Sequence, residues 1–313
     1  MKNELMLEKW PGKVATLGIG ATLEEGGSRK TTIKVGGQES LPFLFQEGKI
    51  PHKPALAFEI WDVYPSDWPR QLLDAYGDTL KDPLRWAKKC VQEYKAELLC
   101  LKLQGAHPDF GNKDAQEEAG LVKELLKTVD VPLVILGSDD DVKDNAVLPA
   151  CSEAARGERC LIGDAMQDNY KTLTAAVLAD GHNIIAESPI DVNIAKQLNI
   201  LISDMGLSLE RIAINPTIGA LGYGLEYAYS IMERARLAAL AGDNALAMPF
   251  VCLVGQESWR AKEAKASSEA GCGIGWEIVT ATALLQAGAD LLVMRHPKAI
   301  EKIHNYIEEI FRR

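Results

Sequence analysis

The sequence predicts one α/β domain in which eight β/α units close into a barrel. From residue 55 to the C-terminus, eight short apolar runs alternate with amphipathic segments. Each run is apolar without interruption, as expected for a parallel strand that is buried on both faces. Eight such units in about 260 residues are typical of a (β/α)8 TIM barrel. An open doubly wound sheet is the alternative, and it requires that two strands be misread.

An N-terminal β-hairpin precedes the barrel. The runs VATLGIG and TTIKVGG, within residues 14–36, flank a Gly-Gly-Ser turn at residues 26–28, a pattern typical of two paired strands. We therefore expect an N-terminal extension over residues 1–50, whose hairpin closes the barrel, and the barrel itself over residues 51–313. No linker or low-complexity run divides the chain, which favours a single domain.

Strands and helices are expected in regular alternation. The strands are residues 55–60, 98–103, 131–136, 160–163, 183–186, 211–214, 250–254 and 291–294. The helices are residues 84–94, 114–128, one ending at 156, then 169–179, 194–205, 223–241, 276–287 and 298–311. Asp82-Pro83 is a typical helix start. Gly157, Gly181 and Gly206 are expected to end helices. Long loops are expected after the first strand and after the seventh.

Composition excludes several classes of partner. The 313 residues include 34 Lys and Arg against 44 Asp and Glu, a net charge of −10. An acidic surface repels nucleic acids and anionic membranes. No apolar stretch reaches the roughly 20 residues of a membrane-spanning helix, and the N-terminus lacks the apolar run of a signal peptide. Six cysteines without a CxxC pair indicate reduced core thiols. A cytoplasmic protein is expected.

Polar side chains follow the predicted strands. Active sites of this fold form from the loops after the carboxyl ends of the strands, so these residues are expected to meet at the barrel mouth. They are Asp62, Gln104, Ser138, Asp139, Asp164, Ser188, Asn215, Gln256, Glu257, Arg295 and His296. The mouth should therefore be polar and acidic.

The histidines disfavour a metal site. A metal hydrolase needs two or more histidines that converge with carboxylates on one ion. The five histidines are His52, His107, His182, His296 and His304, and at most His107 and His296 face the mouth. His182 is expected to begin a strand, and His304 to lie on the last helix. We expect surface or supporting roles for all five, and no metal ligand from this chain.

Lys102, near the end of the second strand, is the one candidate for a Schiff-base lysine. Such a lysine sits desolvated at a strand end. The same side chain could instead extend between barrel and helices or pair with a carboxylate of the mouth. These alternatives stay open at the level of sequence.

Two glycine clusters lie before helices. The first contains Gly219, Gly222 and Gly224, and the second contains Gly271, Gly273 and Gly275. Neither is a dinucleotide-binding GxGxxG or a P-loop. Close packing is the simpler explanation, and it is favoured for the second cluster. For the first cluster, backbone N–H groups at a helix start could also receive an anion such as the phosphate of a cofactor.

An aromatic–proline stretch, IWDVYPSDWP at residues 60–69, follows the first strand. Two tryptophans and two prolines exceed what a solvated loop needs. The stretch could cover the end of the barrel, or it could anchor a protein interface, since Trp and Tyr often do so.

Four long segments closely resemble one family. They are RWAKKCVQEYKAELLCLKLQGAHPD (85–109), GHNIIAESPIDVNIAKQLNILI (181–202), NPTIGALGYGLEYAYSIMERARLAAL (215–240) and ATALLQAGADLLVMRHP (281–297). The family is the small subunit of the corrinoid iron–sulfur protein, also called the delta subunit of the acetyl-CoA decarbonylase/synthase complex. The likeness runs from about residue 10 to the C-terminus.

The resemblance implies a non-catalytic or half-catalytic barrel that works as one subunit of a heterodimeric methyl carrier. In that family a large (gamma) subunit holds the iron–sulfur cluster and the corrinoid, and the mouth of the small TIM barrel covers the corrinoid. The corrinoid accepts a methyl group from methyltetrahydrofolate on a separate methyltransferase and delivers it to acetyl-CoA synthase in the Wood–Ljungdahl pathway. A reductive activator is a further candidate partner.

The residues agree with this implication. The chain has no four-cysteine cluster motif and no DxHxxG corrinoid-ligand motif, so it is expected to ligate neither iron nor cobalt. A polar mouth could hydrogen-bond the amides of a corrin ring and shelter its reactive face from water. The residues expected to border the corrinoid are Asp139, Asp164, Ser188, Asn215, Gly222 and Tyr223. No catalytic residue is assigned.

Two other functions stay open. One is an autonomous methyltransferase that binds methyltetrahydrofolate in the barrel, because similar pterin-binding barrels hold the pterin with acidic or amide side chains at strand ends. Asp139, Asp164 and Asn215 are the nearest equivalents by position. The other is a Schiff-base lyase that uses Lys102.

Overall fold

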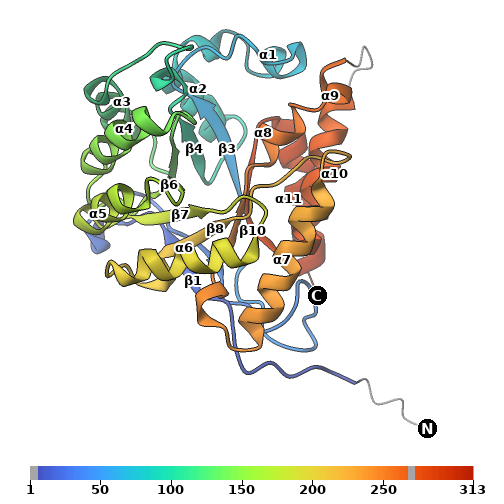
Figure 1. Cartoon of the computed structure of the whole chain (residues 1–313). Helices are drawn as coiled ribbons and strands as arrows, with labels where there is room; N and C mark the ends of the chain where they lie inside the picture. The colour runs from blue at the N-terminus through green and yellow to red at the C-terminus, as the bar shows by residue number, and fades with distance from the viewer. Residues whose placement is uncertain (1–5, 267–271, 313) are drawn as a thin grey trace.

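A computed structural model describes residues 6–266 and 272–312 of the chain. Eight parallel strands close into a barrel in the order β10-β3-β4-β5-β6-β7-β8-β9, with the helices outside the strands (Figure 1). The predicted (β/α)8 TIM barrel is therefore confirmed. The strands are β3 Ala55–Trp61, β4 Leu99–Lys102, β5 Leu133–Leu136, β6 Leu161–Ala165, β7 Asn183–Glu187, β8 Ile212–Asn215, β9 Phe250–Cys252 and β10 Ala289–Met294.

The helices begin and end close to the predicted residues. They are α1 Arg70–Tyr76, α2 Pro83–Gln92, α3 Ala115–Thr128, α4 Asp141–Ala154, α5 Tyr170–Asp180, α6 Val192–Asp204, α7 Leu225–Leu240, α8 Val254–Ser258, α9 Lys262–Ala266, α10 Cys272–Ala287 and α11 Pro297–Phe311. The Asp82 carboxylate accepts a hydrogen bond from the Leu84 N–H at 2.9 Å, with Pro83 as the first helical residue. Gly181 ends α5 with a φ of 83°.

Two segments that were expected to be loops contain short helices. In the loop after the first strand, residues 70–81 form α1 and a 3-10 turn, Gly77–Lys81. The loop after the seventh strand contains α8 and α9, and α8 begins at Val254, which was predicted to be the last residue of that strand. Helices of five to seven residues are too short to show a periodic apolar pattern. Helix α10 begins at Cys272, before the predicted residue 276, and it buries Gly273 against the ring of Trp259. Packing therefore explains Gly273; Gly271 lies outside the described residues.

The N-terminal hairpin packs across the amino ends of the barrel strands. β1, Thr16–Ile19, pairs antiparallel with β2, Ile33–Gly36. Leu17, Ile19 and Val35 are buried in one cluster with the side chains that fill the barrel, which include Leu98, Cys100, Val134, Leu161, Ile185, Ala213, Val251 and Leu291. The Asn183 side chain donates a hydrogen bond to the Gly18 carbonyl at 2.8 Å. The division of the chain at residue 50 stays a prediction.

A buried ion pair lies beside the hairpin. Arg236 of α7 and Asp290 of β10 are each 2% exposed in their side chains and lie 2.8 Å apart. Gln38, just after β2, donates to the Asp290 carboxylate and accepts from Arg236. The Phe250 N–H also donates to Asp290, at 2.9 Å. This network ties the extension to α7, β9 and β10.

Five of the six cysteines are buried and all six are free thiols, in agreement with the predicted core cysteines. Burial raises the pKa of the Cys160 thiol to about 12, which keeps this sulfur protonated and unreactive. Within residues 6–266 and 272–312, no helix combines the length and the apolar character needed to cross a membrane.

Candidate functional site

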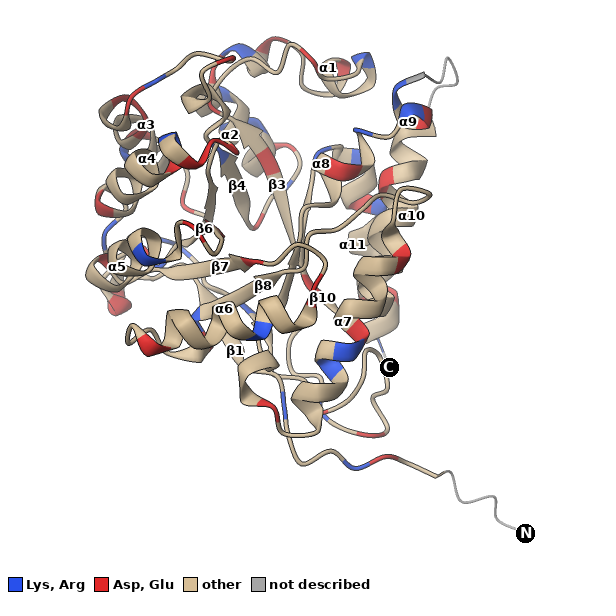
Figure 2. Cartoon of the chain, viewed as in Figure 1, with Lys and Arg blue, Asp and Glu red and all other residues tan. Residues whose placement is uncertain are grey.

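The interior of the barrel changes from apolar to charged at its carboxyl end. Along β3, the buried Ala57 is followed two residues later by Glu59; along β4, Cys100 is followed by Lys102. Residues two apart on a strand face the same side. Glu59 and Lys102 therefore point into the barrel, above the apolar side chains of Ala57 and Cys100. Figure 2 shows the acidic residue within β3 and the acidic loop that leads into α4.

Lys102 forms an ion pair at this charged layer. Its Nζ lies 2.6 Å from the Asp139 Oδ1 and 3.3 Å from the Gln256 Oε1, and its side chain is almost fully buried. Of the three interpretations open for Lys102, the structure shows pairing with a carboxylate of the mouth. Because the ammonium group is held by two acceptors, this arrangement gives no support to a Schiff-base nucleophile.

Asp164 and Glu187, at the ends of β6 and β7, form a carboxyl pair. Burial, followed by the charge of Glu187, raises the pKa of Asp164 well above its usual range. Burial also raises the pKa of Glu187, although a hydrogen bond from Thr217 Oγ1 at 3.1 Å opposes the rise. The Asp164 Oδ1 is buried without a hydrogen-bond partner among the described residues. A protonated carboxyl can donate as well as accept hydrogen bonds.

Ser188 and Asn215 lie next to this pair. The Ser188 N–H donates to the Asn215 carbonyl at 3.0 Å, and the Thr217 hydroxyl donates to the Ser188 carbonyl at 2.7 Å. Ser188 is fully buried, and its hydroxyl has no partner in the described part of the chain. The structure thus gathers Asp139, Asp164, Ser188 and Asn215, by way of Lys102 and Thr217.

Gly222 and Tyr223 lie apart from the other four predicted site residues. They belong to the turn before α7, where the half-exposed Tyr223 donates its hydroxyl to the Glu263 carboxylate at 2.9 Å. Gly222 has a φ of 77° and borders a shallow depression of about 380 Å³ on α7. Gly219 packs tightly against the Tyr223 backbone, so close packing explains this glycine. Anion binding by the cluster stays a prediction.

The backbone is strained around the mouth. Among the described residues, seven non-glycine residues have a positive φ, and four of them lie in loops that follow barrel strands: Asn112, Asp139, Ile190 and Thr217. Ile190 (47°) and Thr217 (53°) are β-branched, for which this conformation is a genuine outlier. Strain of this kind collects at functional sites, because folding alone does not favour it.

Exposed apolar side chains surround the mouth, and we call them the apolar rim. They come from the loops and helix starts that follow β3, β4, β5, β7 and β8, and each is more than a third exposed. They are Tyr64, Phe110, Val142, Ile190, Tyr223 and Tyr227. Single exposed apolar residues are ordinary, but a set arranged around one opening indicates a contact surface.

The aromatic–proline stretch mainly covers the barrel end. Trp61 and Trp68 are buried, and the Arg295 guanidinium lies 5.4 Å and 4.8 Å from their ring centroids. Arg295 is itself paired with the Glu59 carboxylate at 2.7 Å. Of the two roles considered for the stretch, covering therefore holds for the tryptophans, and Tyr64 alone presents an exposed ring.

The two buried histidines have structural contacts. Burial lowers the pKa of His296 to about 4, and the ring stacks on Trp259. Below it, the buried Glu277 accepts hydrogen bonds from the backbone N–H groups of Arg295 and His296. The His182 ring lies between the Cys160 N–H and the Ser152 carbonyl. The described residues contain no group of three or more metal-ligating side chains placed to hold an ion.

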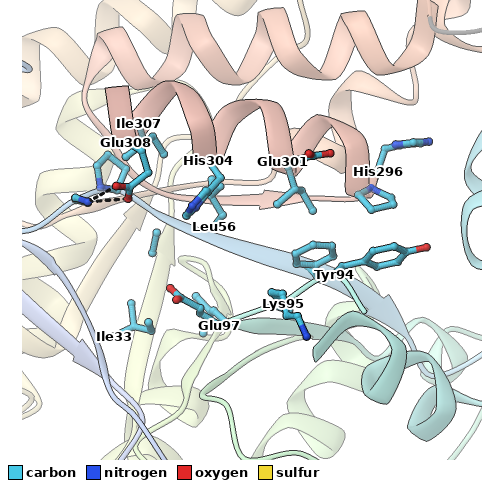
Figure 3. Close-up of a pocket in the computed structure, with 18 of the residues that line it drawn as sticks. Ile33, Leu56, Tyr94, Lys95, Glu97, His296, Glu301, His304, Ile307 and Glu308 are labelled. Atoms are coloured by element: carbon cyan, nitrogen blue, oxygen red, sulfur yellow. Dashed lines mark hydrogen bonds and ion pairs between the residues drawn. The ribbon is translucent and has the colours of Figure 1, made fainter. Parts of the chain in front are cut away.

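A large groove lies on the side of the barrel rather than at its mouth. It has a volume of about 1590 Å³ and lies between α11 and the segment after α2. In Figure 3, Glu301, His304 and Glu308 of α11 face Tyr94 and Glu97 across Leu56 of β3. Its lining carries both signs of charge and includes the Lys53–Glu308 ion pair. Nothing in this mixed lining points to one ligand.

Several residues of the mouth were not found from the sequence. Glu59 was visible as a lone acid in the apolar run ALAFEIW, a signal that could have found it. Glu187 precedes Ser188 and ends β7 with its side chain toward Asp164. Sequence does not show which of two adjacent polar residues points inward. Thr217 acts through a backbone conformation that no pattern predicts.

Solved structures with a similar fold include dihydropteroate synthases. The Xanthomonas albilineans enzyme with 4-aminobenzoic acid has a TM-score of 0.58 and 15% identity, over 83% of this chain and 94% of that chain. The Thermus thermophilus enzyme has a TM-score of 0.57 and 12% identity, over 83% of this chain and 95% of that chain. At such identities the likeness shows the fold alone.

The sequence itself is similar to archaeal proteins named acetyl-CoA decarbonylase/synthase complex subunit delta. The protein of Methanothermobacter thermautotrophicus is 36% identical over 98% of this chain and 78% of its own length. That of Methanocaldococcus jannaschii is 35% identical over 95% of this chain and 74% of its own length. A family profile described as CO dehydrogenase/acetyl-CoA synthase delta subunit matches residues 19–307. The chain therefore belongs to the CO dehydrogenase/acetyl-CoA synthase delta subunit family.

Proposed function

We propose that this chain is the small subunit of a heterodimeric corrinoid iron–sulfur methyl carrier, and that its mouth covers a corrinoid held by the large (gamma) subunit. The chain has no turnover of its own in this proposal. Family membership supports a role within an acetyl-CoA decarbonylase/synthase complex, and the methyl-carrier role is our addition. The observation that carries it is the apolar rim around a charged floor.

The rim and the floor suit a flat ligand presented by another protein. Six exposed apolar side chains follow five of the barrel strands and are available to a partner, and aromatic residues often anchor such contacts. Inside the rim, Lys102, Asp164 and Glu187 offer donors and acceptors. A corrin ring has an apolar face, which the apolar rim can contact. It also has a periphery of amides, which need hydrogen-bond donors and acceptors.

The residues present fit a corrinoid as hydrogen-bonding groups, not as cobalt ligands. The Asp164 Oδ1 and the Ser188 hydroxyl are buried polar atoms without partners among the described residues. Unpartnered buried polar atoms are costly in a folded protein, and the amide side chains of a corrinoid would supply the missing partners. Asp139, Asn215, Gly222 and Tyr223 stay predicted corrinoid neighbours.

Bound there, the corrinoid would supply the cobalt that carries the methyl group. This chain would exclude water from the ring and fix its orientation through the mouth. The further partners we propose are a methyltetrahydrofolate:corrinoid methyltransferase, acetyl-CoA synthase and a reductive activator, each of which must reach the same face in turn. The cover must therefore open, which agrees with strain at Ile190 and Thr217.

A matched pair of variants tests the covering role. Ile190 and Ile200 are each 42% exposed, but only Ile190 belongs to the apolar rim. Ile190→Asp places a charge in the proposed interface, and aspartate tolerates the positive φ of this position better than isoleucine. Complexes purified from the native organism should lose the cobalt-containing and iron-containing subunit with Ile190→Asp and retain it with Ile200→Asp. Equal retention by both variants would remove the mouth from the interface.

An autonomous pterin methyltransferase is the second candidate, favoured by the Asp164 Oδ1, which is buried without a hydrogen-bond partner among the described residues and belongs to a carboxyl beside Asn215. Protonated and ionised carboxyls can recognise the N–H groups of a pterin. Titration calorimetry of the isolated chain with methyltetrahydrofolate separates the two. Tight binding, together with methyl transfer to free cobalamin, would replace the covering role by an enzyme.

A further inference from the structure

A second groove lies where α2 and α3 end, away from the barrel mouth, and we call it the lysine groove. It has a volume of about 980 Å³ and lies between α2 and α3, with the loop 28–30 of the N-terminal extension at one end. Lys30, Lys88, Lys123 and Lys127 line it. These lysines come from three separate elements of the chain.

The charge of the groove is the reverse of the charge of the chain. The whole sequence has a net charge of −10, whereas four lysines against Asp130 and Glu158 line this groove. Glu158 is already used by Arg29, at 2.8 Å. Within the described chain, Lys30, Lys88 and Lys123 form no ion pair, and Lys127 pairs only with the exposed Glu124. Unneutralised positive charge therefore remains.

Arg29 holds the end of the groove in place. Its buried guanidinium donates to the carbonyls of Leu126 and Val129, both at 2.6 Å, and so satisfies the C-terminal end of α3. The neighbouring Lys30 N–H donates to the Asp130 carbonyl at 2.8 Å. This loop is thus fixed before any partner arrives, which lowers the entropic cost of binding.

The stability of the helices does not fully explain the groove. Lysines in the last turns of helices interact favourably with the helix dipole, and Lys127 on α3 fits that role. Lys30 lies on a loop, however, and gains nothing from a helix dipole. The half-buried Val91 and Leu126 also leave apolar surface between the lysines. Apolar surface flanked by cations is the complement of an acidic amphipathic segment.

We propose that the lysine groove binds an acidic amphipathic segment of another subunit of the complex. The inference rests on the proposed function only in requiring partner subunits. A compact phosphate is disfavoured, because α2 and α3 end at this groove and anions are bound at helix N-termini, not C-termini. Carboxylates on side chains can instead reach the outer lysines while apolar neighbours cover Val91 and Leu126.

Amine acetylation of the free chain and of the intact native complex tests this docking. Lys30, Lys88, Lys123 and Lys127 should be protected in the complex on the order of tenfold, while the exposed Lys49 and Lys302, outside the groove, keep their reactivity. In the matched variants, Lys88→Glu/Lys123→Glu should weaken retention of a partner by about tenfold, and more at low salt. Lys49→Glu/Lys302→Glu makes the same charge change outside the groove and should leave retention unchanged.

The outcomes separate this inference from the proposed function. If partners co-purify and the groove lysines stay reactive, the docking proposal is wrong and the covering role stands. If protection appears when inorganic phosphate or ADP is added to the free chain, the groove takes a small anion and the proposal is equally wrong. If no partner co-purifies at all, both fail. If the two double variants weaken partner retention equally, the effect comes from the overall charge of the chain, and the docking proposal is wrong.

Discussion

The two ends of the barrel differ in what fills them and in how their buried polar groups are hydrogen-bonded. At the amino end, apolar side chains of the hairpin fill the opening, and the buried Arg236–Asp290 pair forms hydrogen bonds with Gln38, Gly288 and Phe250. At the carboxyl end, charged groups replace the apolar side chains that fill the barrel. There Asp164 and Ser188 keep polar atoms without partners among the described residues, and Ile190 has a strained backbone.

This difference separates stability from function along one barrel. Buried polar groups cost little when every partner is present and much when one is missing. The amino end comes closer to the first condition, because within the Arg236–Asp290 pair only the Arg236 Nε lacks a hydrogen-bond partner among the described residues. Changes there should therefore destabilise the fold. The carboxyl end retains features that folding alone does not favour, so changes there should cost little stability or increase it.

The largest effect is expected at the buried ion pair. Asp290→Ala leaves Arg236 buried without its carboxylate, and we expect a loss of about 4 kcal/mol in the free energy of unfolding. Denaturant unfolding followed by circular dichroism measures it. The double variant Arg236→Met/Asp290→Leu removes both charges and should recover much of the loss. Failure of the double variant to recover would mean that the hydrogen bonds to Gln38 and Phe250, rather than the unpaired charge, dominate.

The hairpin that fills the amino end should come next. Leu17→Ala opens a cavity in the cluster at the base of the barrel, with an expected cost of about 3 kcal/mol. Leu23, in the connection between β1 and β2, is 82% exposed. Leu23→Ala is therefore a matched control with almost no expected loss of stability. The two unfolding midpoints compare them directly. Similar midpoints would show that the extension does not contribute to the stability of the barrel.

Most of the fold could be predicted because its physical signals are local. Strands buried on both faces are uniformly apolar, and glycines such as Gly181 mark helix ends. The misses were α1, α8 and α9, which are too short to show a period. The hairpin pairing was predicted from its turn, and its register, Thr16 opposite Gly36, follows from packing on the barrel.

The site could be predicted only in part. Residues that end strands, such as Asp164 and Asn215, were found because fold topology brings strand ends together. Glu187 was missed because orientation at a strand end depends on the register and on the irregular pairing of β6 with β7. The apolar rim was missed because exposure of Val142 or Ile190 is a tertiary property. Gly222 and Tyr223 were predicted from their place in the loop after the sixth strand. The Tyr223 hydroxyl bonds to Glu263 and Gly222 borders the depression on α7, so their contact with a corrinoid stays a prediction.

At the mouth, a change should increase stability in a pH-dependent way. Asp164→Asn removes a carboxyl whose pKa is raised by burial and by Glu187. Because the folded chain holds this proton more tightly, the native protein loses stability as pH rises above the ordinary carboxyl pKa of about 4. The variant should therefore match the native protein near pH 4 and exceed it by about 1 kcal/mol at pH 7. Thermal unfolding at both pH values tests this, and a variant less stable at pH 7 would contradict the assignment.

The smallest change in the free energy of unfolding is expected at Ser188, and Ser152 serves as its matched control. Both Ser188 and Ser152 are fully buried, but the Ser152 hydroxyl donates to the Asp180 carboxylate at 2.7 Å, whereas that of Ser188 has no partner among the described residues. Ser152→Ala should therefore cost about 1–2 kcal/mol, and Ser188→Ala should change stability by less than about 0.5 kcal/mol. Retention of the corrinoid subunit should respond in the reverse order, because only the Ser188 hydroxyl is free to bond a ligand at the mouth. If Ser188→Ala costs as much as Ser152→Ala, this hydroxyl has an internal partner and the two ends of the barrel are less different than proposed.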